Sequence, residues 1–400
     1  MINVIGLGYI GLPTALMLAA NGNDVVGTDI NSKTVGELGA GHVTFKENGL
    51  DELFDKAVNN GIRFSAECCD ADIYIIAVPT PYNKDNKKID AKAVCGAVED
   101  VLKVCRDNAV IVIESTIAPG TVEHFIRPIV RGRKVHLAHA PERIIPGNML
   151  YELQHNSRTI GADDCKIGEK IKDVYASFCK GEIVVTDIKT AEMSKVVENT
   201  YRDINIAFAN ELAKICRNDN MDVYKIINIA NRHPRVNILQ PGPGVGGHCI
   251  SVDPWFLVGD YPGLANIILT ARKINDSMPE FVLKRAREIM DENCITDIKR
   301  VGLYGLTYKE NVDDTRESPT LQLLECMRAH LAGSIKVYDP FVKNDIVDNQ
   351  YHDPGEFFND TDMVIVMVAH DEILKNRHFL DGKVVFDTRN AFKEKDYYKL

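Results

Sequence analysis

A glycine-rich stretch at 242–256 places a cysteine where it can act as a nucleophile. Four glycines lie within residues 242–247, and Cys249 follows them closely. Because glycine lacks a Cβ atom, this loop can approach a polar ligand and offer its backbone amides. Asp253 comes four residues after Cys249, on the same side of the chain if the segment is helical. A thiol beside a carboxylate suits covalent chemistry, although most free cysteines are simply buried small hydrophobic residues.

The first residues of the chain show the pattern of a dinucleotide site. A strand leads into Gly6, Gly8 and Gly11, and an apolar helix follows. In this arrangement the first glycine permits the turn, the second admits a pyrophosphate and the third lets the helix pack on the strand. A second strand ends at Asp29, 18 residues past Gly11, which suits a ribose diol. Because an acid there repels a 2′-phosphate, the pattern favours NAD over NADP.

Three further apolar strands end in polar residues. They are the strands at 73–78, 110–113 and 135–139, followed respectively by Thr80, by Thr116, and by Glu142 and Arg143. Ligands of open parallel sheets bind at the carboxyl ends of the strands, although a polar residue there can also cap the next helix. The sequence leaves open whether Glu142 and Arg143 form a surface pair or an acid-base and anion-binding pair.

A long helix is predicted from about residue 190. Its apolar stripe has helical spacing, and a stripe of this length is long enough to pack against a second subunit. Lys195, Asn199 and Arg202 share one face, which is either solvated or directed at one ligand. Helices at 222–231 and 264–291 complete a helical middle region, and His233 and Arg235 add donors just before the cysteine loop.

The last hundred residues read as a second, degenerate copy of the first fold. Strands are predicted at 300–306, 335–339, 362–368 and 384–387, but the full glycine pattern is missing. We therefore expect this half to bind something smaller than a dinucleotide, such as a nucleoside diphosphate, or nothing. The charged or aromatic residues at its expected mouth are Tyr308, Lys309, Arg316 and Arg389.

Composition limits the class of protein. A chain of 400 residues is too long for one hydrophobic core, so we expect two or three domains. The net charge of −10 argues against nucleic acid or an anionic membrane as partner. No apolar run approaches the roughly 20 residues of a membrane span, and the first residues do not resemble a signal peptide. Ten cysteines without CxxC pairs predict a reducing, cytoplasmic location and no metal site.

Together these features predict an α/β enzyme that oxidises a nucleotide-linked group. Oxidation of an alcohol to a ketone needs only a base and a hydride acceptor. Oxidation from an aldehyde to an acid needs a nucleophile, and a cysteine supplies it through a thiohemiacetal and a thioester.

Several motifs resemble those of the UDP-glucose/GDP-mannose dehydrogenase family, in order along the whole chain. They are the glycine turn at 6–11 and the segments 79–81, 114–116, 141–143, 192–199, 246–249 and 314–319. The resemblance implies an N-terminal Rossmann dinucleotide-binding domain at 1–188, a helical central and dimerisation domain at 189–292, and a C-terminal Rossmann-like UDP-binding domain at 293–400. It also implies NAD as cofactor, a UDP-sugar as substrate, and a homodimer or a dimer of dimers.

The implied reaction is the four-electron oxidation of the sugar C6 hydroxymethyl to a uronate. Segments 232–237 and 248–256 look most like those of family members that act on UDP-N-acetyl-D-mannosamine. UDP-N-acetylglucosamine and UDP-glucose are the alternative substrates. Two alternative functions belong to other classes of protein. One is a two-electron hydroxyacid dehydrogenase, which would not need Cys249, and the other is a catalytically silent nucleotide-sugar-binding protein.

The resemblance also assigns residues. The catalytic set is Cys249 as nucleophile, Lys195 as proton donor or acceptor, Asn199 and Thr116 holding the reacting oxygen or a water, Asp253 orienting a water or the lysine, and Glu142 assisting thioester hydrolysis. The cofactor contacts are Gly6, Gly8, Tyr9, Ile10, Gly11, Asp29, Thr80, Thr116 and Arg316. The substrate contacts are Arg143, Ile144, Lys195, Asn199, Arg202, His233, Arg235, Gly244, Tyr308 and Lys309, with Arg389 as a candidate for the diphosphate.

Overall fold

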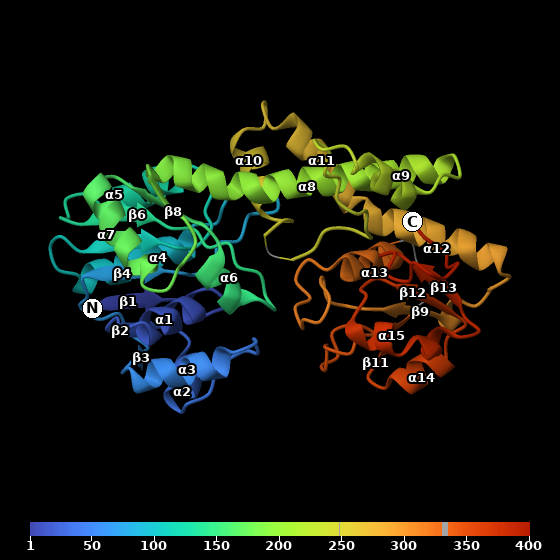
Figure 1. Cartoon of the computed structure of the whole chain (residues 1–400), viewed down its shortest axis with the longest axis horizontal. Coiled ribbons are helices and arrows are strands. Elements are labelled where there is room, and N and C mark those ends of the chain that lie inside the picture. Colours follow the sequence, from blue (N-terminus) through green and yellow to red (C-terminus); the bar gives the residue numbers. More distant parts are fainter. Residues whose placement is uncertain (248, 330–334) are drawn as a thin grey trace. The chain divides into compact units, whose positions relative to one another are not determined.

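The computed structural model describes residues 1–247, 249–329 and 335–400 (Figure 1). These residues form two compact units, each built on a mainly parallel β-sheet, which confirms the predicted α/β class. The first unit comprises Met1–Glu198 and Trp255–Asp260, and the second comprises Asn199–Pro254 and Tyr261–Leu400. The boundary falls within the long helix α8 (Ile188–Asn218).

The first unit contains an eight-stranded sheet in the order β3-β2-β1-β4-β5-β6-β7-β8, in which only the β6–β7 pair is antiparallel. Its strands are β1 (Ile2–Ile5), β2 (Val25–Thr28), β3 (Arg63–Ser65), β4 (Ile73–Ile76), β5 (Val110–Ile113), β6 (His136–His139), β7 (Arg158–Ala162) and β8 (Ile183–Thr186). The five strands expected from apolar runs are confirmed. The strands β3, β7 and β8 were not predicted, because β3 is short and exposed, β7 contains an arginine and a glycine, and β8 is half-exposed.

Helices cover both faces of this sheet. They are α1 (Gly11–Ala20), α2 (Ser32–Gly39), α3 (Leu50–Asn59), α4 (Lys92–Val104), a π-helical turn (Val122–Ile126), α5 (Arg127–Val130), α6 (Met149–His155) and α7 (Cys165–Ala176). Side chains of a strand alternate between faces, so Ile73 and Ile75 join the core with α1, α3, α6 and α7. Tyr74 and Ile76 join the second core, with α4. Burial on both faces explains the continuous apolar runs of β4 and β5.

The second unit repeats the strand order on a smaller scale. Its parallel sheet runs β11-β10-β9-β12-β13, equivalent to β3-β2-β1-β4-β5 of the first. The strands are β9 (Val301–Tyr304), β10 (Lys336–Tyr338), β11 (Gln350–Tyr351), β12 (Met363–Val366) and β13 (Val384–Asp387). The helices beside them are α13 (Pro319–Ala329), α14 (Pro354–Asn359) and α15 (Asp371–Lys375). The prediction of a second copy is confirmed.

The middle region is helical, as predicted. Its helices are α8, α9 (Val223–Ala230), α10 (Asp253–Asp260), α11 (Asn266–Asp276) and α12 (Met278–Glu292). The helix expected at 264–291 is two helices that meet at Ser277, because Pro279 has no N–H to donate to the carbonyl oxygen of Asn275 and instead lies in the first turn of α12. The domain boundaries at 188 and 292 stay a prediction. No helix in the described part of the chain is both long and apolar enough to cross a bilayer.

Candidate active site

In the glycine turn between β1 and α1, sterics require two of the three glycines, Gly6 and Gly11. Gly6 has φ +89°, and a Cβ atom there would lie 2.5 Å from the carbonyl oxygen of Ala77. A Cβ atom at Gly11 would lie 1.9 Å from the carbonyl oxygen of Gly6. At Gly8 a Cβ atom would meet nothing within 4 Å. The backbone at Gly8 therefore borders open space at the start of α1, as a pyrophosphate site requires.

Asp29 lies at the end of β2, beside this turn. Its carboxylate accepts hydrogen bonds from the backbone N–H groups of Leu7 and Asn31, both at 2.8 Å. Tyr9 packs on Phe45, with ring centroids 4.4 Å apart. An acid held next to the glycine turn suits a ribose diol.

Two other predicted cofactor contacts come together at the same edge of the sheet. The hydroxyl of Thr80, after β4, donates a 2.6 Å hydrogen bond to the carbonyl oxygen of Thr116, after β5. Both residues are partly exposed, and Ile10 packs partly buried against the core. The structure thus brings the ends of β1, β2, β4 and β5 together in one parallel array.

Glu142 belongs to a buried ionic cluster. Arg158 in β7 pairs with Glu142 and, at 3.1 Å, with Glu114, and the Tyr175 hydroxyl donates to Glu114 at 3.1 Å. Burial, opposed by the charge of Arg158, raises the pKa of Glu114 to about 7. Sequence reasoning did not identify Arg158. An arginine in the otherwise uncharged segment 158–162 is the signal that marks it.

Arg143 makes several contacts within the first unit. Its guanidinium pairs with Glu198 at 2.7 Å and donates to the carbonyl oxygen of Ser157 and to the hydroxyl of Thr159. The next residue, Ile144, is buried. Arg143 is therefore an anchored cation and not a loose surface residue, and its role as a substrate contact stays a prediction.

The polar residues of α8 differ in exposure. Lys195 and Asn199 are 5% and 6% exposed, whereas Arg202 is exposed. The Asn199 amide donates a 2.6 Å hydrogen bond to the carboxylate of Asp253. This bond joins two predicted catalytic residues that lie 54 positions apart.

The cysteine loop packs against the segment that follows β9. Gly244 and Gly247 have φ +141° and +84°, conformations that favour glycine. A Cβ atom at Gly246 or Gly247 would lie under 3.0 Å from Tyr308. The N–H of Gly247 donates to the carbonyl oxygen of Arg316 at 2.9 Å. Gly244 thus belongs to the cysteine loop, and Tyr308 packs against Gly246 and Gly247 of the same loop.

Cys249 is exposed and lies just before α10. Its carbonyl oxygen accepts the N–H of Asp253, the first residue of α10, at 2.9 Å. A helical turn therefore connects Cys249 to Asp253. His248, which precedes the cysteine, lies outside the described residues.

The remaining predicted contacts lie in the second unit, and among them Arg389 is close to the cysteine loop and to Tyr308. A guanidinium nitrogen of Arg389 lies 3.0 Å from the place of a Cβ atom at Gly242, and Arg389 donates to the carbonyl oxygen of Tyr308 at 3.5 Å. Lys309 is partly buried, and Arg316 pairs with Asp314 at 2.6 Å. His233 and Arg235 are exposed, and the N–H of Arg235 donates to the His233 ring.

Three family models match the chain in order. Residues 1–179 match the NAD binding domain of the UDP-glucose/GDP-mannose dehydrogenase family, residues 189–277 its central domain and residues 302–394 its UDP binding domain. The chain belongs to the UDP-glucose/GDP-mannose dehydrogenase family. As a member of this family it is an oxidoreductase, as predicted.

Named relatives match over nearly the whole length. A UDP-N-acetyl-D-mannosamine dehydrogenase of Methanocaldococcus jannaschii is 42% identical, covering 99% of this chain and 95% of the relative. The structure of a UDP-N-acetyl-mannosamine dehydrogenase from Staphylococcus aureus is 41% identical with a TM-score of 0.89, covering 100% and 97%. An NDP-N-acetyl-D-galactosaminuronic acid dehydrogenase of Ralstonia nicotianae is 39% identical, covering 98% and 96%.

The dehydrogenase family match divides the predicted contacts by domain. Every predicted cofactor contact lies in the NAD binding domain match except Arg316, which lies in the UDP binding domain match with Tyr308, Lys309 and Arg389. Cys249, Lys195, Asn199 and Asp253 lie in the central domain match.

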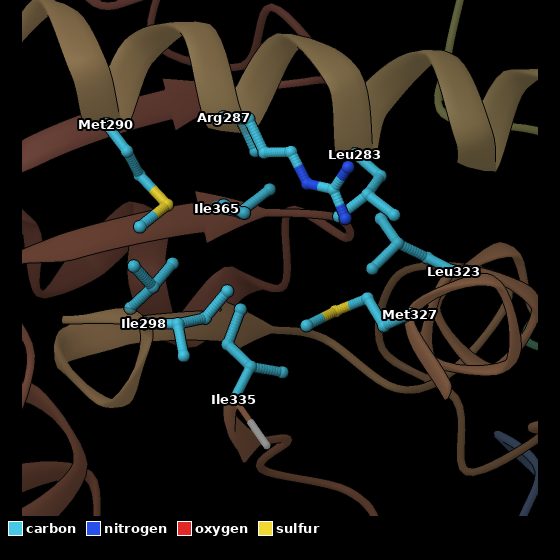
Figure 2. Close-up of a pocket in the computed structure, with 10 residues that line it drawn as sticks. Leu283, Arg287, Met290, Ile298, Leu323, Met327, Ile335 and Ile365 are labelled. Carbon is cyan, nitrogen blue, oxygen red and sulfur yellow. The ribbon is translucent and has the colours of Figure 1, made fainter. Parts of the chain in front are cut away.

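A small pocket lies elsewhere, between α12, α13 and the sheet of the second unit. Figure 2 shows Leu283, Arg287, Met290, Leu323 and Met327 around it. It has room for no more than about one water molecule, and apart from Arg287 the residues that line it are apolar. A space of this size and character is a packing gap, not a nucleotide-sugar site.

Proposed function

We propose that this chain oxidises the C6 hydroxymethyl of UDP-N-acetyl-D-mannosamine to the carboxylate, giving UDP-N-acetyl-D-mannosaminuronate. The arrangement at the start of α10 carries the proposal. Cys249 precedes the helix, and Asp253 in its first turn accepts a hydrogen bond from Asn199. The names of the relatives support the choice of sugar.

NAD is the proposed hydride acceptor. The open space at Gly8 and the carboxylate of Asp29 beside the turn fit a dinucleotide. The glycine turn would hold the pyrophosphate and Asp29 the ribose diol. NAD accepts one hydride in each of two oxidations.

In the first oxidation, the C6 hydroxyl loses its proton while hydride leaves C6, giving an aldehyde. Lys195 is the proposed acid-base residue, because an ammonium held away from water stabilises an alkoxide or exchanges a proton with it. Asn199 and Thr116 are proposed to hold the reacting oxygen.

In the second oxidation, the Cys249 thiolate adds to the aldehyde carbon, and the oxygen takes up a proton to give a thiohemiacetal. The position just before α10 supports this role, because a helix N-terminus favours negative charge. Loss of hydride and the hydroxyl proton gives a thioester. Water, oriented by Asp253 and assisted by Glu142, then releases the carboxylate and regenerates the thiol. One water is consumed for two NADH formed.

For the substrate, local cations offset the net charge of −10. Arg143, Arg202, His233, Arg235, Lys309 and Arg389 are the proposed donors to the UDP-sugar. Tyr308 and Gly244 are proposed to shape the site around it.

The test counts NADH formed per molecule of limiting sugar. UDP-N-acetylmannosamine is compared with UDP-N-acetylglucosamine, UDP-glucose and UDP-N-acetylgalactosamine. Two NADH from the mannosamine sugar alone support the proposal, and two from another sugar keep the Cys249 chemistry but replace the substrate. One NADH indicates a two-electron dehydrogenase, and none from any sugar indicates a binding role.

We also propose a homodimer formed through α8. Tyr201, Phe208 and Ile215 are seven residues apart on this helix and 61%, 49% and 51% exposed. Large apolar side chains exposed along one face are typical of an interface. The measurement is the mass in solution of the wild type and of Phe208→Asp. We expect the variant to have half the mass, and a monomeric wild type would remove the proposal.

A further inference from the structure

The only tryptophan of the chain, Trp255, lies in α10 two residues after Asp253 and is 9% exposed. The ammonium of Lys87 lies 4.4 Å from the centroid of its ring and 5.5 Å from that of Tyr82. The Tyr82 ring stacks on Trp255 at 6.3 Å. A cation over the faces of two aromatic rings attracts both.

Lys87 belongs to a hydrogen-bonded loop, residues 81–90, that we call the clamp loop. Tyr82 and Ile89 form an antiparallel bridge, and Asn83 exchanges backbone hydrogen bonds of 2.8 Å with Lys87 and Lys88. Lys87 has φ +62°, a left-handed conformation that is unfavourable for a residue other than glycine. The hydrogen bonds of the clamp loop therefore hold the Lys87 backbone in a strained conformation, in which the ammonium lies over the Trp255 ring.

The helix α10 contacts the clamp loop at a second point. A Cβ atom at Gly259 would lie 2.5 Å from the carbonyl oxygen of Lys87. Gly259 is four residues after Trp255, so both lie on one face of α10. The clamp loop thus supports this face over a full helical turn.

The supported helix is continuous with the proposed catalytic segment. Asp253 is its first residue, and the N–H of Asp253 donates to the carbonyl oxygen of Cys249. The clamp loop begins directly after Thr80, a proposed cofactor contact. A contact that holds α10 therefore acts on the helix whose first residue is hydrogen-bonded to Cys249.

We infer that Lys87 is a positioning residue, which holds Trp255 and α10 so that Cys249 and Asp253 keep a productive orientation. The inference rests on the proposed function for the roles of Cys249 and Asp253. Lys87 is assigned no contact with either substrate. Replacing Lys87 should therefore change kcat and leave KM for the substrates unchanged.

The test compares Lys87→Met, Lys87→Arg and, as a matched control in the same loop, Lys88→Met. We expect Lys87→Met to lower kcat by about 10-fold to 100-fold, with KM for NAD and for the UDP-sugar within about twofold. Lys87→Arg should restore most of kcat, because a guanidinium also binds aromatic faces. Lys88 is exposed, and its charge acts on Asp260 at the far end of α10, where water screens it. Lys88→Met should therefore behave as wild type.

The fluorescence of Trp255 shows whether the contact was broken. Its emission should shift to longer wavelength in Lys87→Met as the ring meets water. A shifted emission with wild-type kcat would overturn the inference. If Lys87→Met does not fold, Tyr82→Leu removes the other half of the contact and is judged by the same two measurements.

A second readout separates this inference from the proposed function. If the wild type oxidises no UDP-sugar, the rate of Cys249 alkylation by iodoacetamide is followed on its own tryptic peptide. We expect this rate to change at least threefold in Lys87→Met and not in Lys88→Met, with the exposed Cys294 as internal reference. An unchanged Cys249 rate would overturn the positioning role.

Discussion

The imidazole of His370 donates a hydrogen bond from Nε2 to the carboxylate of Asp339 at 3.1 Å, and both side chains are fully buried. The proton lies on Nε2 because Nδ1 accepts the backbone N–H of Asn311 at 3.0 Å. Asp339 also accepts the N–H groups of Leu306 and Thr307.

This pair marks a difference between the second sheet and the dinucleotide pattern of the first. The strand registers of the two sheets correspond. Asp29 and Asp339 each directly follow the second strand of their sheet, β2 and β10, and are therefore equivalent. Thr80 and His370 each lie four residues past an equivalent strand, β4 and β12. The first unit has the small Thr80 at the position equivalent to His370. In the second unit the His370 imidazole takes up a hydrogen-bonding position on the Asp339 carboxylate, and a ribose diol would need that position. Thr307 also replaces Gly8, so a side chain stands where a pyrophosphate would approach.

Replacing His370 with alanine should lower the free energy of unfolding by about 1–3 kcal/mol at pH 7, because buried Asp339 loses a partner. Burial alone would raise the pKa of Asp339, but the hydrogen bonds that its carboxylate accepts from His370 and from the backbone amides outweigh burial and lower the pKa. A carboxyl whose pKa is lower in the folded state stabilises the fold at pH values above its unfolded-state pKa. This stabilisation is lost as the pH falls through the folded-state pKa. The variant should therefore begin acid unfolding at higher pH.

Urea unfolding at pH 7 and an acid titration measure both effects of His370→Ala. His352→Ala is the matched control, since His352 pairs with Asp345 at 2.8 Å on the surface. We expect the control to lose less than about 1 kcal/mol. Equal losses in the two variants would contradict a special role for the buried pair.

Cys249→Ser should abolish uronate formation, because a serine hydroxyl is far less ionised than a thiol at neutral pH. The aldehyde stage should remain reachable, so NADH should not exceed one per sugar. The products are identified by mass spectrometry. Cys165→Ser, at another exposed cysteine, should yield uronate at the wild-type rate. Normal uronate from Cys249→Ser would refute the covalent mechanism.

Lys195→Ala should slow turnover by about 10² or more while NAD binding stays intact. The measurements are kcat under saturating substrates and the NAD dissociation constant from titration. Lys189→Ala, an exposed position on the same helix, should change neither quantity. Wild-type turnover in Lys195→Ala would exclude Lys195 from the mechanism.

Asp29→Asn should reduce the preference for NAD over NADP by about tenfold, since it removes the charge that repels a 2′-phosphate. The amide oxygen can still accept the N–H of Leu7, so the turn should remain intact. The ratio of kcat/KM values for the two cofactors measures the change. Asp24→Asn, an exposed acid paired with Arg63, should leave the ratio unchanged, and an equal ratio in all three proteins would count against the ribose contact.

Local sequence patterns predicted the elements that local physics determines. The apolar runs of β1, β4 and β5, the glycine turn at Gly6 and the stripe of α8 each signal one element within a few residues, because strand and helix periods are local. The strand β7 escaped prediction because its burial depends on a distant partner. Arg158 sits in it only because Glu114 and Glu142 surround its charge.

The sequence by itself determined the family, the repeated α/β architecture and the candidate residues, since motifs and periodicity are written in short segments. Only the tertiary structure decided which of these residues meet. The bonds Asn199–Asp253 and Asp339–His370 and the contact Lys87–Trp255 join residues far apart in the chain. Such contacts depend on how strands and helices pack, and packing is a property of the whole folded unit and of no single segment.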